Sequence, residues 1–150
     1  MRKFLVLLDE TQECLNAIRF AALRAAHSQG GVVVLSVIPA AEIQHGFGVA
    51  DVMRAEAHER IESQFAIYAN WMRDHLGVTP ELVIQEGDPV AELRKLIAAD
   101  PKIGILVLAA ATGGGPDPVI GKLMRELGQM SCPITIVPGE IGLERLEQIT

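Results

Sequence analysis

Five short apolar runs occur along this chain, and segments with helical periodicity separate them. The runs occupy residues 4–8, 32–38, 81–85, 103–109 and 133–137. A run that is apolar throughout, such as the first, is typical of a parallel strand that is covered on both faces. Strands that alternate with helices are joined by right-handed crossovers. The sequence therefore predicts an α/β fold built on an open, five-stranded parallel sheet that is doubly wound.

The intervening segments carry helix signals. We expect the hydroxyl of Thr11 to cap the first helix and Gly30-Gly31 to end it. Asp88 and Pro89 suit the first positions of a short helix. The longest segment has apolar residues at steps of three and four. This pattern predicts a helix with one apolar face that packs in the core or in a dimer interface. This stripe consists of Ile61, Phe65, Tyr68, Met72 and Leu76.

The length of 150 residues fits one domain with one core, so we expect a single domain over residues 1–150. Residues 39–50 lack periodicity and predict a mobile loop, and whether residues 40–50 close over a ligand stays open. In the last predicted helix Val119, Leu123 and Leu127 are expected to face inward. Residues 140–150 are expected to form a peripheral tail.

The charge balance excludes some classes of partner. A formal net charge of -6 disfavours nucleic acid, whose binding depends on Lys and Arg that neutralise phosphates. The five apolar residues after Lys3 are too few for a signal peptide or a membrane span, so we expect no membrane association. Cys14 and Cys132 have no metal-ligand spacing, and Cys14 is expected to be a buried small hydrophobe. These features predict a cytoplasmic protein.

Two features converge where the winding of the predicted sheet reverses. Asp9 ends the first strand, and the glycines at 113–115 follow the fourth strand and precede a helix. Ligands of such sheets bind at this reversal, beyond the carboxyl ends of the strands. Glycines and free helix amides favour a bound phosphate. The simpler alternatives are that Asp9 only ends a strand and that the glycines form a flexible connection.

Four segments in a fixed order carry a more specific signal. They are the first strand with Asp9-Glu10-Thr11, the strand that ends in Pro39, the Gly87-Asp88-Pro89 turn, and the segment from the glycine loop to Cys132-Pro133 and the last strand. Together these pieces resemble the universal stress protein (UspA) family over nearly the whole chain. The resemblance implies a Rossmann-like fold with strand order 3-2-1-4-5 and a small cytosolic homodimer, and some members bind ATP.

The resemblance also implies residues for a nucleotide site. Asp9 and the backbone of Val37 would hold the adenosine. A loop of the pattern Gly-x2-Gly-x9-Gly-Ser/Thr would hold the phosphates, but here Ala109 stands at the first glycine, and Gly121 is followed by Lys122. Asp117 adds a negative charge close to the phosphates, which a Mg²⁺ ion would have to bridge. The cofactor-binding candidates are Asp9, Val37, Ala109, Thr112, Gly113, Gly114, Gly115, Gly121 and Lys122.

No catalytic group is evident. The serines lack the nucleophile-elbow pattern, and Glu62 stands where a zinc-binding helix would need its second histidine after His58. The leading hypothesis is a stress-response regulatory protein that binds ATP or another adenine nucleotide, at most a slow ATPase with a metal near Asp9. The alternative is a dimeric scaffold with a degenerate phosphate loop, paired through the edge strand at residues 134–137.

Overall fold

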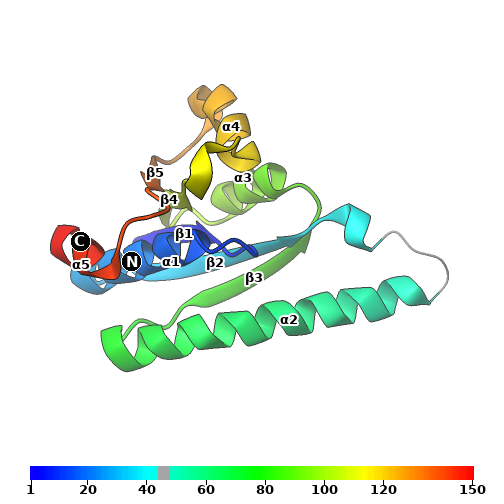
Figure 1. Ribbon diagram of the computed structural model, residues 1–150, viewed down its shortest axis with the longest axis horizontal. Coiled ribbons are helices and arrows are strands. Elements are labelled where there is room, and N and C mark those ends of the chain that lie inside the picture. The colour runs from blue at the N-terminus through cyan, green and yellow to red at the C-terminus, as the bar shows by residue number, and fades with distance from the viewer. Residues whose placement is uncertain (44–47) are drawn as a thin grey trace.

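The computed structural model describes residues 1–43 and 48–150, apart from the surroundings of Gly114. Its sheet is parallel throughout, with the order β3-β2-β1-β4-β5 (Figure 1). This confirms the predicted fold and strand order. Of the loop predicted over residues 39–50, Ala40–Glu42 forms a short helical turn and residues 49 and 50 already belong to the long helix, while residues 44–47 lie outside the described residues. The mobility of this segment remains a prediction. The strands are β1 (Lys3–Leu7), β2 (Gly31–Ile38), β3 (Glu81–Glu86), β4 (Ile103–Ala109) and β5 (Ile134–Val137).

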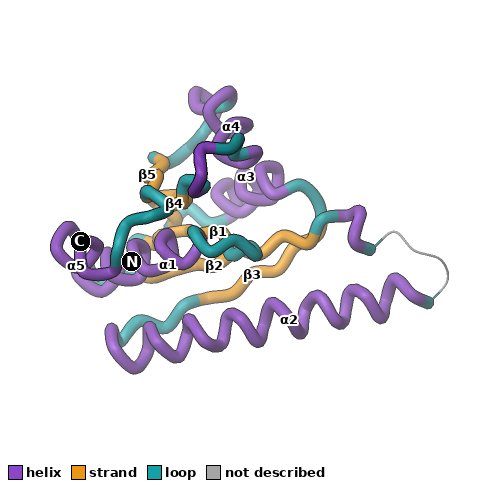
Figure 2. Tube along the Cα trace, in the orientation of Figure 1, coloured by secondary structure: helices purple, strands orange, loops and turns teal. Residues whose placement is uncertain are grey.

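Helices cover both faces of the sheet (Figure 2). One face packs against α1 (Cys14–Ser28), α2 (Val49–Trp71) and α5 (Leu143–Ile149), and the other packs against α3 (Pro89–Ala99) and α4 (Pro118–Arg125). Short helical turns complete the fold: η1 (Ala40–Glu42), η2 (Met72–Leu76), η3 (Thr112–Gly114) and η4 (Leu127–Gln129). This is the three-layer arrangement that a doubly wound sheet requires.

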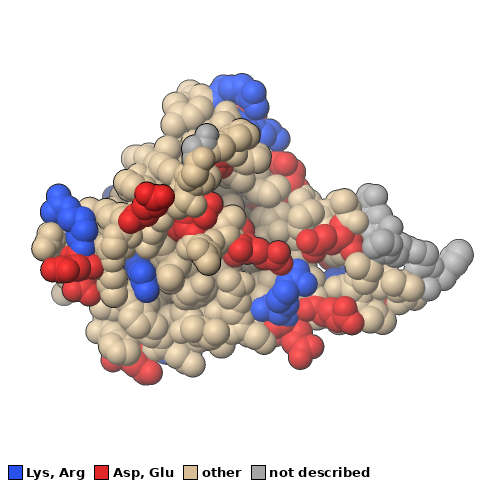
Figure 3. Space-filling view, in the orientation of Figure 1, with Lys and Arg blue, Asp and Glu red and all other residues tan. Residues whose placement is uncertain are grey.

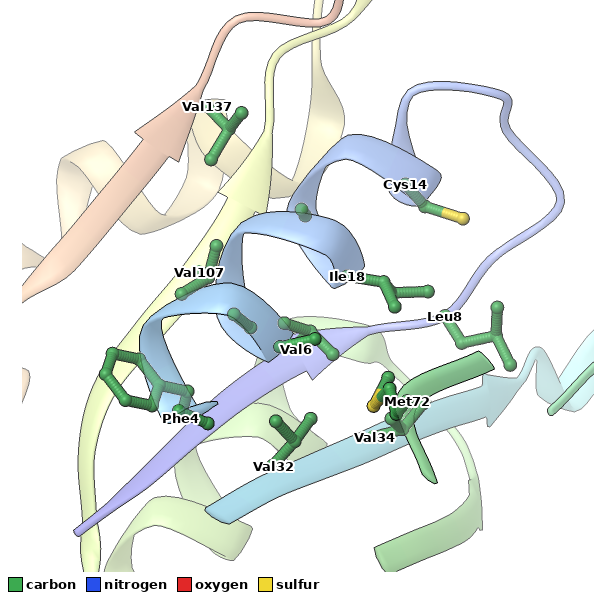
Figure 4. Packing of buried hydrophobic residues seen from close by; sticks show 14 of the residues in the cluster. Phe4, Val6, Leu8, Cys14, Ile18, Val32, Val34, Met72, Val107 and Val137 are labelled. Carbon is green, nitrogen blue, oxygen red and sulfur yellow. The ribbon is translucent and has the colours of Figure 1, made fainter. Parts of the chain in front are cut away.

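Alternation along β1 divides the core into two layers. Phe4 and Val6 pack on the side of α1, and Figure 4 shows this layer with Leu8, Ile18 and Met72. Leu5 and Leu7 point to the side of α3 and α4. Successive side chains of a strand point to opposite faces, so a continuous apolar run supplies both layers at once. The first strand is apolar throughout because its residues contribute to both core layers.

The long apolar stripe packs as predicted. Ile61 and Met72 are buried in the α1-side layer, and the other three members pack against it while partly exposed: Phe65, Tyr68 and Leu76. Gly77, with φ of 67°, ends this helical stretch in the left-handed conformation that glycine adopts without strain. The stripe is therefore part of the core.

The predicted start of the third helix is confirmed. The Asp88 carboxylate accepts a hydrogen bond from the backbone amide of Ala91 at 2.9 Å, and Pro89 occupies the first helical position. This pairing is favourable because the side chain satisfies an amide that has no partner within the helix.

The predicted capping of the first helix by Thr11 is wrong. The residue before α1 is Glu13, and its side chain makes no capping hydrogen bond. The hydroxyl and the amide of Thr11 both donate to Asp9 instead. Aspartate readily accepts from the amide two residues on, and this local turn competes with helix capping.

Two leucines exchange the roles that we expected of them. Leu127 is 48% exposed, and it lies in η4, beyond the last residue of α4 at Arg125. The segment predicted to be a peripheral tail instead forms α5, and its Leu146 is fully buried against α1. Arg24 of α1 also donates to the carbonyl of Thr150 at 3.2 Å. The C-terminal helix is thus part of the core.

Truncation of these two leucines separates their roles. Leu146→Ala is expected to lower the free energy of unfolding by about 2–5 kcal/mol, because it removes buried methyl groups and leaves a cavity. Leu127→Ala, the matched control, is expected to change it by less than about 0.5 kcal/mol when the protein is dilute enough that two chains do not associate. Urea titration followed by circular dichroism measures both values. Equal effects of the two substitutions would contradict the packing of α5.

Candidate functional site

Asp9 lies where the sheet opens at the carboxyl end of β1. Two cavities adjoin it. The first, here the β4-side cavity, has a volume of about 250 Å³ and lies between β1, the end of β4 and the start of α4. The second, the β2-side cavity, has a volume of about 280 Å³ and lies between β1, the end of β2 and α2. Asp9 borders both, as expected for the point where the winding reverses.

A local turn fixes the Asp9 carboxylate. Its Oδ1 atom accepts hydrogen bonds from the Thr11 amide at 2.9 Å and from the Thr11 hydroxyl. In the described part of the chain no donor bonds to Oδ2, and the side chain is exposed. One carboxylate oxygen therefore holds the turn and the other is available to a ligand.

Val37 faces the same opening with its backbone. The pairing of β1 with β2 ends at Leu7 and Leu35, and the Leu8 amide donates to the Leu35 carbonyl at 2.8 Å. Along a strand the polar backbone groups alternate in direction, so those of Val37 point the same way as those of Leu35. There β1 has already ended, and Val37 lines the β2-side cavity with Asp9. The structure thus brings Asp9 and Val37 together.

The glycine segment takes a different path. Thr112, Gly113 and Gly115 are exposed and line neither cavity at Asp9. Thr112 borders a shallower groove with Glu10. The surroundings of Gly114 lie outside the described part of the chain. The Ala110 amide pairs with the Val137 carbonyl at 2.8 Å, and η3 follows. Ala111 and Pro116, on either side of the glycines, border the β4-side cavity, and Ala109 is the one described loop candidate that does so.

The amino-terminal end of α4 is capped by the side chain of Asp117. The Asp117 carboxylate accepts from the Ile120 amide at 3.0 Å, and the Asp117 carbonyl accepts from the Gly121 amide at 2.8 Å. Pro118 has no amide hydrogen to offer. The amides that a phosphate would use are therefore largely satisfied within the chain, and Asp117 adds a negative charge beside them.

Lys122 points to α3 and not to either cavity. Its Nζ atom lies 3.1 Å from Oδ2 of Asp88, the capping residue of α3. The Ala91 amide, together with the Lys122 ammonium, lowers the pKa of Asp88 below its usual value. This pair joins the starts of α3 and α4. The predicted phosphate contact of Lys122 therefore has a competing partner in the chain.

The two cavities differ in charge. Asp9, Glu13 and Asp117 border the β4-side cavity, and no lysine, arginine or histidine of the described residues lines it. Asp9, Glu10 and Glu42 border the β2-side cavity, and Arg60 of α2 is the one cationic side chain among the described residues that line it. Figure 3 shows acidic side chains across the middle of this face of the molecule. Sequence reasoning missed Arg60, because an arginine on a polar helix face carries no distinguishing motif.

The thiol of Cys14 borders the β4-side cavity but is unsuited to nucleophilic chemistry. Burial raises the pKa of Cys14 to about 12. Its Sγ atom donates to the Asp9 carbonyl at 3.5 Å. Since only the thiolate is a good nucleophile, Cys14 acts as a packing residue, as the sequence predicts.

Comparison with known proteins identifies the type of fold and family. The model of the universal stress protein family matches residues 1–138. UspA from Lactobacillus plantarum has a solved structure with a TM-score of 0.71 and 16% identity, covering 91% of this chain and 97% of that one. Comparison with curated proteins gives no significant match.

Two further solved structures hold nucleotides according to their descriptions. A universal stress protein from Archaeoglobus fulgidus in complex with dAMP has a TM-score of 0.59 at 15% identity, over 91% of this chain and 98% of that one. A universal stress protein in complex with cAMP has a TM-score of 0.58 at 19% identity, over 93% and 98%. At these identities the likeness establishes the fold.

No helix within residues 1–43 and 48–150 has the length and apolar character that crossing a membrane requires.

Proposed function

Because the chain belongs to the universal stress protein family, we propose that it is a cytoplasmic stress-response regulator that binds ATP or another adenine nucleotide beside Asp9. The observation that carries this proposal is the meeting of Asp9 and the Val37 backbone at one cavity. Two proteins of the same fold are described in complex with dAMP and cAMP, which supports an adenine ligand.

The β2-side cavity offers the groups that an adenosine needs. The amide and carbonyl of Val37, beyond the end of the β1 pairing, can donate to a ring nitrogen and accept from the amino group of adenine. Oδ2 of Asp9 can accept from a ribose hydroxyl. Ile61 and Pro39 supply apolar surface to the same cavity. Apolar surface combined with convergent polar groups is typical of small-molecule sites.

We assign the site a binding role and no catalytic residue. A hydrolase would need an activated water or a nucleophile, and the neutral Cys14 thiol supplies neither. In the described residues no three acidic, histidine or cysteine side chains gather closely enough to hold a metal ion. A Mg²⁺ ion at this site would therefore have to arrive with the phosphates of the nucleotide. Any ATPase activity is expected to be slow.

Replacement of Asp9 tests the proposed ligand site. Asp9→Asn keeps an oxygen for the Thr11 turn but replaces the free carboxylate oxygen with an amino group, which cannot accept from ribose. We expect adenine nucleotides to raise the melting temperature of the unmodified protein, and a ligand at a hundred times its Kd to add about 2.7 kcal/mol of stability. Asp9→Asn should bind at least about tenfold more weakly, whereas Asp74→Asn on the exposed η2 turn should bind normally.

The measurement is a thermal shift series confirmed by isothermal titration calorimetry, with AMP, ADP and ATP, each with and without Mg²⁺. Guanosine nucleotides serve as the ligand control. Absence of any adenine-dependent shift at millimolar concentration would remove the nucleotide proposal. Equal binding by the unmodified protein and Asp9→Asn would show that the ligand does not contact the Asp9 carboxylate.

A second function, a homodimeric scaffold, has its own supporting observation. β5 is an edge strand of the sheet, and a recess of about 200 Å³ lies beside it. Met124 and Leu127 border this recess and are 49% and 48% exposed. An unpaired edge next to exposed apolar side chains favours pairing with a second copy. We therefore propose that two chains pair antiparallel along β5.

A proline on the edge tests this dimer. The carbonyls of Pro133 and Val137 accept from β4, so by alternation the backbone groups of Ile136 point away from the sheet. Ile136→Pro then removes an outward amide without loss of a bond to β4. We expect a dimer for the unmodified protein and for Ile136→Val, and a monomer for Ile136→Pro, by light scattering at micromolar concentration. A monomeric unmodified protein would contradict the proposal.

A further inference from the structure

The β2-side cavity is lined by the cationic side chain of Arg60, whose ion-pair partners can be replaced by a ligand. Nε of Arg60 lies 3.3 Å from Oε1 of Glu10, and Nη2 lies 3.7 Å from Oε2 of Glu42. All three side chains are about half exposed or more, so these ion pairs contribute little to stability. A phosphate accepts two parallel hydrogen bonds from a guanidinium and carries more charge than a carboxylate. It can therefore displace either glutamate from Arg60.

The β4-side cavity repels further phosphates. Glu13 and Asp117 border it together with Asp9, and no basic side chain of the described lining offsets them. The Asp117 side chain already occupies the start of α4, where an anion would otherwise find free amides. Charges of the same sign repel one another more strongly in a partly enclosed space than in open water.

No other described cation near the loop can compensate. Lys122 is paired with Asp88 and lines neither cavity at Asp9. Arg125 is exposed on α4 and lines neither cavity. Both cavities at Asp9 are thus lined by carboxylates, and they differ in that the β2-side cavity also contains the exchangeable Arg60, whereas no described cation lines the β4-side cavity.

We propose that the site selects adenine nucleotides with a single phosphate: Arg60 binds that phosphate, and Asp117 excludes the β- and γ-phosphates of ATP. This inference rests on the proposed function and specifies its ligand class. Arg60 and Asp117 are then the residues that determine how many phosphates the site accepts.

The first experiment concerns Asp117. Titration calorimetry in EDTA, without divalent metal, is expected to show AMP binding at least about tenfold more tightly than ATP, as loss of charged contacts commonly produces. Asp117→Asn keeps a side-chain oxygen for the Ile120 amide, so α4 retains its cap. This variant should bind ATP within about threefold of AMP, with its affinity for AMP unchanged. An equal preference for AMP in Asp117→Asn would overturn the role of Asp117.

The second experiment concerns Arg60. Arg60→Gln is expected to weaken AMP binding about tenfold or more while adenosine binding stays unchanged, because adenosine has no phosphate to lose. Arg73→Gln, at the far end of the same helical stretch, is the matched control and should bind both ligands normally. Circular dichroism melting of each variant checks that the fold is retained.

The outcomes separate this inference from the proposed function. ATP that binds the unmodified protein as tightly as AMP in EDTA would overturn the selection by phosphate number and leave the nucleotide site standing. An unchanged AMP affinity in Arg60→Gln would overturn the assignment of Arg60. Failure of adenosine, AMP and ATP alike to bind would remove the proposed function itself.

Discussion

The place of β1 between β2 and β4 determines where this molecule can bind a ligand. Both neighbours are parallel to β1, and its pairing with β2 ends at Leu7 and Leu35. Beyond that point the backbone of Val37 continues without a partner on the β1 side, and Asp9 leaves the sheet between two cavities. The opening follows from the winding of the chain, and the side chains that border it then decide what it can hold.

The charges around this opening are arranged by the elements that meet there. α2 contributes Arg60 to one cavity, and the start of α4 contributes Asp117 to the other. Asp117 serves the fold first, because it caps α4, and its charge at the cavity is a consequence of that role. Lys122 likewise serves the fold by pairing with the cap of α3. Local requirements of helix ends thereby set the charges that border the cavities at Asp9.

Much of the fold was predictable because its signals are local. Largely apolar runs marked all five strands, and their alternation with helical segments indicated a doubly wound parallel sheet, while the strand order was implied by the family resemblance. Asp88 and Pro89 specified a helix start from two adjacent residues. Asp9 and Val37 also met as expected, since the ends of parallel strands share one edge of the sheet.

The errors have causes that sequence patterns do not reveal. The hydroxyl of Thr11 can either cap the first helix or donate to Asp9, and the sequence around it does not decide between the two. Leu127 follows a helix end that no glycine or proline marks, and the burial of Leu146 depends on α1, far away in the sequence. The glycine segment has the composition of a phosphate loop, but Gly113 and Gly115 line neither cavity at Asp9. Arg60 reaches the site only because α2 packs on the same face of the sheet as α1, which brings it to the cavity beyond the end of β2.

The central claim is that an adenine nucleotide lies against Val37 and Asp9 and not on the glycine segment. The most direct measurement is a titration of ¹⁵N-labelled protein with AMP, followed through the backbone amide signals. The account predicts the largest shifts at Val37 and at Asp9 to Thr11, with little change at Gly113 and Gly115. Saturable shifts centred on Gly113 and Gly115, with Val37 unmoved, would contradict it.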